Sequence, residues 1–148
     1  MCNMSERRIG FELRNTHNLL RRHVAHTKLP ELCESTDIHG WAIHYFYKNQ
    51  DRDIFQRDFE SHFSIRRSTA TNMLKRMELN GLILREAVPY DARLKKIVLT
   101  PKASAILQQI EHNISVLESG LCKGISDEEL ETFFSVLDKI KYNLEEMQ

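Results

Sequence analysis

The sequence predicts a mainly α-helical protein with one small β-hairpin, an α+β arrangement within a single domain of 148 residues. Three observations favour this fold class. Apolar residues recur at helical spacing through most of the chain, and two short runs rich in β-branched residues lie close together between residues 82 and 99. Hydrophobic residues make up 41% of the chain, which is enough to fill a core.

The first two predicted helices cover about residues 6–27 and 38–49. One face of the first helix carries Leu13, Leu20 and Val24. Leu29-Pro30 should end this helix, because the residue before a proline disfavours the helical conformation. We expect residues 30–37 to connect the two helices, with Thr36 or Asp37 as a cap. The second helix is rich in aromatic residues, so it should be largely buried or lie at an interface.

A short helix over residues 56–62 and a longer one from Arg66 to Gly81 are predicted next, separated by a tight turn. One face of the longer helix carries Ala70, Met73, Leu74 and Met77. Ser64 stands where we expect the N-cap of this helix. Gly81 can adopt the left-handed conformation that ends it.

A β-hairpin follows, built from the runs at residues 82–84 and 97–99. The polar, proline-containing stretch at residues 87–93 lies between them. We therefore predict a long tip rather than a two-residue turn.

The last two predicted helices have clear start signals. Thr100 supplies a capping hydroxyl before Pro101, and Ser126 with Glu129 matches the capping-box pattern. One stripe of the final helix carries Leu130, Phe133, Phe134, Leu137, Ile140 and Leu144. A single small lobe could hardly bury this stripe together with the apolar face of the first helix.

The polar face of the helix at residues 66–81 is a candidate DNA-reading surface. It carries phosphate- and base-bonding groups without a carboxylate, namely Arg66, Arg67, Ser68, Thr69, Asn72, Lys75 and Arg76. Arg67, Ser68, Thr69 and Asn72 lie toward its N-terminal part and are the residues we expect to face the bases. The alternative is an ordinary solvated helix face.

Charge is unevenly distributed along this neutral chain. Residues 1–60 hold nine basic and nine acidic side chains, whereas residues 61–102 hold nine basic and three acidic ones, a net charge of +6. Residues 103–148 hold three basic and nine acidic side chains, a net charge of −6. A basic patch over the candidate reading elements suits a polyanionic partner.

The order of elements and several local motifs resemble the MarR (multiple antibiotic resistance regulator) family of winged helix-turn-helix transcriptional regulators. The resemblance is sharpest over residues 64–103, where the motifs are Glu78-Leu79-Asn80-Gly81-Leu82-Ile83, Asp91-Ala92-Arg93 and Ile97-Val98-Leu99-Thr100. It implies a winged helix-turn-helix lobe at residues 36–100 and a helical dimerisation region at residues 1–35 and 101–148. The implied assembly is a homodimer that binds double-stranded DNA.

The resemblance also implies roles for the hairpin and for the aromatic helix. The hairpin becomes a wing in which Arg93 enters the minor groove, and Asp91 orients the Arg93 guanidinium or braces the wing. Lys95 and Lys96 add phosphate contacts. Trp41, His44 and Tyr45 are the candidate residues of an effector crevice for a small aromatic ligand, with a purely structural role in the core as the alternative.

The three cysteines, Cys2, Cys33 and Cys122, form no disulfide framework. Cys2 is a candidate redox residue because some members of the family sense oxidants near the N-terminus. The seven histidines show no metal-binding spacing, so we expect neither a metal nor a cofactor. No run is apolar enough for a membrane span or a secretory signal, which favours the cytoplasm.

The resulting hypothesis is a ligand-responsive repressor that binds a pseudo-palindromic operator as a homodimer. Two alternatives stay open: a dimeric helical adaptor for protein interactions without DNA binding, and an oxidant-sensing regulator acting through Cys2. An enzyme is not expected, because no phosphate loop, nucleophile elbow or metal triad is present.

Overall fold

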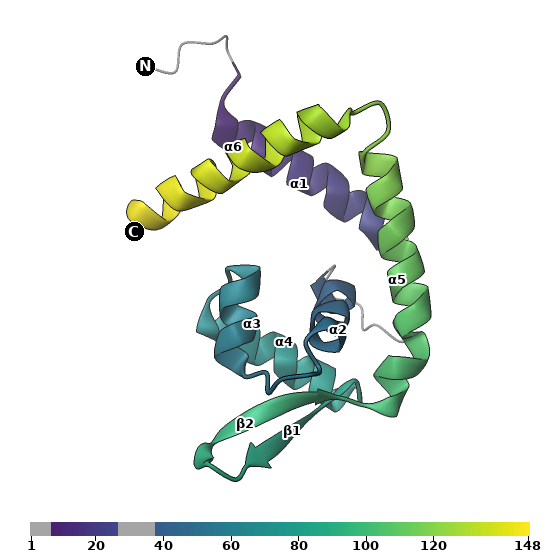
Figure 1. Cartoon of the computed structure of the whole chain (residues 1–148), viewed down its shortest axis with the longest axis vertical. Helices are drawn as coiled ribbons and strands as arrows, with labels where there is room; N and C mark the ends of the chain where they lie inside the picture. Colours follow the sequence, from purple (N-terminus) through teal and green to yellow (C-terminus); the bar gives the residue numbers. More distant parts are fainter. Residues whose placement is uncertain (1–6, 27–37) are drawn as a thin grey trace. The chain divides into compact units, whose positions relative to one another are not determined.

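The computed structural model of this protein describes residues 7–26 and 38–148. The elements are α1 (Ile9–Ala25), α2 (Ile38–Lys48), α3 (Gln56–Phe63), α4 (Arg67–Leu79), β1 (Ile83–Val88), β2 (Asp91–Leu99), α5 (Pro101–Leu121) and α6 (Asp127–Glu146) (Figure 1). This mainly α-helical fold with one β-hairpin confirms the predicted class. The predictions for Cys2, Cys33, Pro30 and the caps Thr36 and Asp37 concern residues outside the described ranges.

The chain forms two compact units, residues 1–111 and 112–148, whose boundary in sequence falls within α5. The domain boundaries expected from the sequence stay predictions. No helix of the described residues is both long and apolar enough to cross a membrane.

The core of the first unit joins α2, α3 and α4 to the base of the hairpin. Its largest fully buried side chains are Phe59, Ile43, Leu74, Met77, Leu82, Ile83 and His39. The apolar face predicted for α4 is buried as expected, and the α2 residues Tyr45 and Phe46 are buried as well. Phe59 of α3 packs against Phe46 with ring centroids 5.5 Å apart.

The turn between α3 and α4 differs from the sequence prediction at Ser64. Ser64 is not the N-cap of α4; it ends α3 in the left-handed conformation, with φ 50° and ψ 42°. Its N–H donates to the Ser61 carbonyl, and the Ile65 N–H donates to the Glu60 carbonyl, which is the Schellman pattern. Ser64 therefore belongs to the C-terminal cap of α3, where the backbone N–H groups of Ser64 and Ile65 satisfy the last carbonyls of the helix. Arg66 is the N-cap of α4.

The hairpin tip is shorter than predicted. β1 and β2 pair antiparallel from Ile83–Leu99 to Ala87–Lys95, and Val88 then pairs with Asp91. Only Pro89 and Tyr90 lie in the turn, so the predicted long tip is wrong. The reason is that Val88, only 4% exposed, keeps β1 paired to its end. The surplus residues 92–94 of β2 form a bulge instead, which places Arg93 within it.

Three other predicted start and stop signals, all within the described residues, are confirmed. Gly81 has a φ of 70° after α4. The Thr100 hydroxyl accepts a hydrogen bond from the Ala103 N–H at 3.3 Å at the start of α5. At α6, the Ser126 and Glu129 side chains accept each other's backbone N–H groups, at 3.2 and 2.9 Å.

Helices α1 and α6 bury no residue, although each has a strongly apolar side. Phe133 and Phe134 of α6 are 54% and 55% exposed. Phe11 of α1 is likewise exposed. These faces agree with the expectation that the terminal helices need a further partner.

Candidate DNA-binding interface

Helix α4 presents its polar face to solvent because its apolar face is anchored in the core. All seven predicted reading residues, Arg66, Arg67, Ser68, Thr69, Asn72, Lys75 and Arg76, are exposed. The inner positions Ala70, Leu74 and Met77 are fully buried. The core therefore sets the rotation of α4 about its axis and places the hydrogen-bonding groups on one outward side.

Arg67 is the first helical residue of α4, and its side chain is 88% exposed. Its Nε lies 3.9 Å from Oε1 of Glu60 on α3, at the outer limit of an ion pair. A contact of this kind contributes little to stability, so Arg67 can turn toward a ligand at small cost.

The wing presents Arg93 and Lys95 to solvent. The Arg93 side chain is 93% exposed, and its Nε lies 3.7 Å from Oδ1 of Asp91. The same carboxylate oxygen accepts a hydrogen bond from the Arg93 N–H at 2.9 Å. Asp91 therefore braces the backbone of the bulge, which leaves the guanidinium directed outward.

Lys96, the fourth predicted wing residue, is held differently from Lys95. Its Nζ lies 3.4 Å from Oδ1 of Asp53, in the loop before α3, and the residue is half-buried. The other carboxylate oxygen of Asp53 accepts a hydrogen bond from the Tyr90 hydroxyl at 3.0 Å. Asp53 thus contacts the turn and β2 of the wing together.

Gln56 makes a second set of polar contacts that sequence reasoning missed. Its Nε2 donates to Oγ1 of Thr71 on α4 at 2.8 Å and to Oε1 of Glu60 at 3.0 Å. Its Oε1 accepts from Nη1 of Arg85 on β1 at 3.5 Å. In the sequence, Asp53 and Gln56 look like residues of a solvated loop and helix start, and only the long-range contacts reveal their roles.

His39 of α2 is the one fully buried histidine among the described residues. Neither of its ring nitrogens has a hydrogen-bond partner in the described part of the chain. Burial lowers the pKa of His39, and the positive charge of Arg76 on α4 lowers it further. The lowered pKa of His39 favours its neutral form.

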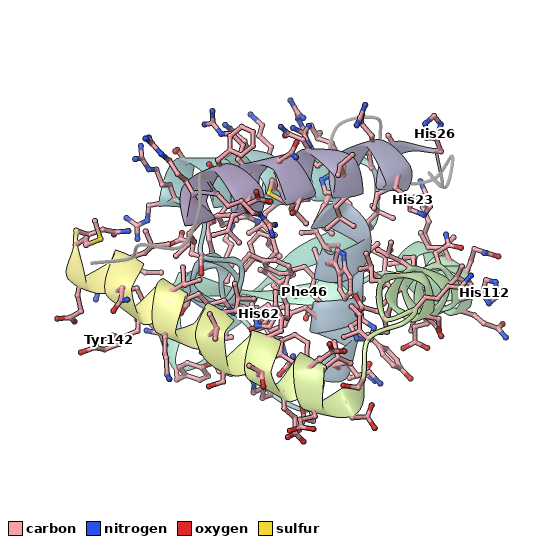
Figure 2. All side chains as sticks on the ribbon, turned by 90° about the horizontal axis from the view of Figure 1, so that it is seen from above. His23, His26, Phe46, His62, His112 and Tyr142 are labelled. Carbon is pink, nitrogen blue, oxygen red and sulfur yellow. The ribbon has the colours of Figure 1, made fainter. Side chains whose placement is uncertain are left out.

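The three predicted crevice residues have different environments. Tyr45 is buried and stacks on His62 with ring centroids 4.1 Å apart; Figure 2 labels His62 and the neighbouring Phe46 in this lobe. Trp41 and His44 are half-buried, with their rings edge to face at 6.4 Å. The His44 Nδ1 lies 3.6 Å from Oε1 of Glu111. Tyr45 thus belongs to the core, whereas Trp41 and His44 stay accessible.

Within residues 7–26 and 38–148, no three His, Cys, Asp or Glu side chains gather as metal ligands. Cys122, in the turn after α5, is a half-buried free thiol.

Comparison with known proteins agrees with this geometry. The model of the MarR family matches residues 49–95, which span α3, α4 and most of the hairpin. The transcription regulator MarR from Oenococcus oeni PSU-1 is 28% identical, with a TM-score of 0.78 over 91% of this chain and 99% of that one. The matched protein from Oenococcus oeni is a transcription regulator, which agrees with the expectation that this chain is not an enzyme.

Two further solved structures carry a ligand. The S. aureus MepR–DNA complex is 23% identical and covers 94% of this chain and 99% of MepR, with a TM-score of 0.82. The heme sensor protein PefR from Streptococcus agalactiae, in complex with heme, is 28% identical and covers 95% of each chain, with a TM-score of 0.63. The match to MepR shows that this chain and MepR share a fold.

Proposed function

We propose that this chain, a member of the MarR family of transcription regulators, binds a pseudo-palindromic DNA operator as a homodimer and releases it on binding a small ligand. One observation carries the DNA-binding part of the proposal. The exposed face of α4 and the bulge of the wing present hydrogen-bonding and basic groups to solvent, while the nearby carboxylates of Asp91 and Asp53 contact Arg93 and Lys96 of the wing.

Helix α4 and the wing should contact different parts of the DNA because their chemistry differs. An α-helix fits the major groove, where Arg can bond guanine and Asn can bond adenine with two hydrogen bonds each. We assign Arg67, Ser68, Thr69 and Asn72 to the bases, and Arg66, Lys75 and Arg76 to the phosphates. Arg93, at the bulge of the wing, suits a narrow minor groove, because its charge is exposed and its backbone is braced by Asp91.

Homodimerisation is supported by the unburied apolar faces of α1 and α6. A two-fold dimer places two equal reading helices on one face, so the operator should be a pseudo-palindrome with half-sites about one helical turn, roughly 34–36 Å, apart. The S. aureus relative was solved with DNA, which supports DNA as the partner.

The DNA-binding proposal can be tested by selecting duplexes from a random library with the purified full-length chain. We expect enrichment of a two-fold-symmetric motif and, with that duplex, binding that weakens steeply as salt increases. Failure to enrich any duplex while the chain stays dimeric would instead favour the protein-interaction adaptor.

Ligand response is supported by the heme-bound relative and by the accessible Trp41 and His44 of α2. Trp41 is the sole tryptophan of the chain, so its fluorescence reports on this region alone. We expect a small aromatic acid or hemin to quench Trp41 and to release the selected duplex over the same concentration range. Quenching without release would contradict the regulatory role of the ligand, and release should be lost in Trp41→Ala.

A further inference from the structure

The wing is a long two-stranded hairpin that the chain connects to the rest of the lobe only at its base, so it can act as a lever. It joins the rest of the lobe at Gly81 and Thr100, where the Thr100 N–H donates to the Leu82 carbonyl at 3.1 Å. With six residues in β1, its tip lies about 20 Å from that base. A rotation of about 10° at the base would displace the tip by about 3 Å, which is enough to break a hydrogen bond. Two strands alone hold such a lever poorly.

Three consecutive contacts join this lever to the segment before α3, which runs beside β2 in Figure 1. The Ile97 N–H donates to the carbonyl of Ile54 at 2.7 Å, so this segment adds a short third partner to the hairpin. Farther out, Asp53 holds Lys96 at 3.4 Å and the Tyr90 hydroxyl at 3.0 Å. The Tyr90 contact acts at the tip, where it has the greatest leverage.

The same segment also holds the reading helix. Gln56 donates to Oγ1 of Thr71 at 2.8 Å, and also to the Arg67 carbonyl at 3.4 Å, at the start of α4. Its Oε1 receives Arg85 of β1, whose Nε lies 3.8 Å from Oε2 of Glu78 on α4. Gln56 therefore joins α3, α4 and β1 through one amide group.

From these contacts we infer that residues 53–56 form a polar anchor that sets the spacing between the reading helix and the wing, with Asp53 and Gln56 as positioning residues for DNA binding. Asp53 acts on Arg93 by holding the wing, and Gln56 acts on the exposed face of α4 by holding Thr71 and Arg67. Neither residue needs to contact DNA. This inference rests on the proposed DNA-binding function.

An opposing role for Asp53 makes the inference testable. Asp53 is an exposed carboxylate beside a basic surface, so its charge alone would repel DNA. If it had only this effect, Asp53→Asn would tighten binding, and Lys96 would become available to a phosphate. If Asp53 positions the wing, the same substitution weakens binding, because the ion pair is lost and the charge-assisted hydrogen bond to Tyr90 becomes an ordinary one.

The first experiment compares Asp53→Asn with Asp51→Asn in the full-length dimer. Asp51 lies in the same loop, is exposed, and makes no ion pair or side-chain hydrogen bond to the described residues, so it controls for the change in charge. Fluorescence anisotropy with the selected duplex should show binding weakened about threefold to tenfold by Asp53→Asn. Asp51→Asn should bind as well as the unsubstituted chain or more tightly. Equal or tighter binding by Asp53→Asn would overturn the inference.

A double-mutant cycle then separates positioning from a general loss of stability. In an Arg93→Ala background, Asp53→Asn should change affinity less than about twofold, because the wing no longer carries the group that it positions. Gln56→Ala should still weaken binding in the Arg93→Ala background, because Gln56 also holds Thr71 and Arg67 of α4. Gln50→Ala, at an exposed glutamine, is its control. If Asp53→Asn weakens binding by the same factor in the Arg93→Ala background as in the unsubstituted chain, the positioning role is contradicted.

Hydrogen exchange of the free protein gives a readout that does not need DNA. Amides of residues 83–99 should exchange faster in Asp53→Asn than in Asp51→Asn, while α5 and α6 stay unchanged. Faster exchange without any DNA binding by the unsubstituted chain would retain the anchor and refute the proposed function. Unchanged exchange in the wing would refute the anchor itself.

Discussion

Arg93 provides the most direct electrostatic test of the proposed interface at the scale of one residue. Its side chain is 93% exposed, so Arg93→Ala should leave the fold intact. Loss of one cation per half-site should weaken DNA binding by about 1–2 kcal/mol and lower the salt slope by about one unit per half-site. Titrations at several salt concentrations measure both quantities. Lys139→Ala, which removes an equal charge from α6, should change neither.

His39 predicts an acid-sensitive stability. Burial first, and the charge of Arg76 second, lower its pKa in the folded state below the usual 6.5. The folded protein therefore binds fewer protons than the unfolded chain, so this contribution to stability is fully present above about pH 6.5 and is lost as the pH falls below it. Urea unfolding at a series of pH values should show this loss.

The control for this prediction replaces His39 with Leu, an apolar residue without a titratable group. The stability of His39→Leu should depend less on pH between about 6.5 and 5 than that of the unsubstituted chain. His23→Leu, at an exposed histidine of α1 that Figure 2 labels, should retain the original dependence. Identical pH profiles for all three proteins would contradict the assignment.

At the scale of one element, α3 ends on a strained residue. Ser64 adopts φ 50°, a conformation that costs L-residues energy and glycine almost none. Ser64→Gly should therefore stabilise the lobe by about 0.5–1 kcal/mol, after allowance for the greater freedom of glycine in the unfolded chain. Ser61→Gly, inside the same helix, should destabilise it by a similar amount. Thermal unfolding compares the two, and destabilisation by both would refute the strain argument.

The elements also show where sequence reasoning succeeds. The burial of Ala70, Leu74 and Met77, the cap at Thr100 and the capping box at Ser126 were all predictable, because each depends on residues within one or two helical turns. The length of the hairpin tip was not predictable, since Val88 is buried and stays paired with Asp91, and burial depends on the tertiary structure.

At the scale of the whole molecule, the apolar face of α6 predicts the assembly. Phe133 is 54% exposed in the single chain, and Phe133→Glu would place a charge in the proposed interface between protomers. We expect sedimentation to show a shift from dimer toward monomer, together with weaker DNA binding. Thr132→Glu, which adds the same charge at an exposed polar position, should remain dimeric. A dimeric Phe133→Glu would exclude this part of α6 from the interface.

The sequence by itself determined the element types, the polar face of α4, the concentration of basic charge at residues 61–102 and the resemblance to the MarR family. These features depend on periodicity, local capping and composition, which act over short distances along the chain. The tertiary structure decided the left-handed end of α3 at Ser64, the bulge at Arg93 and the anchoring of both reading elements by Asp53 and Gln56. The end of α3 depends on a choice between two local patterns at Ser64, whereas the contacts of Asp53 and Gln56 join groups 15 and 37 residues apart in sequence, which only the packed lobe brings together.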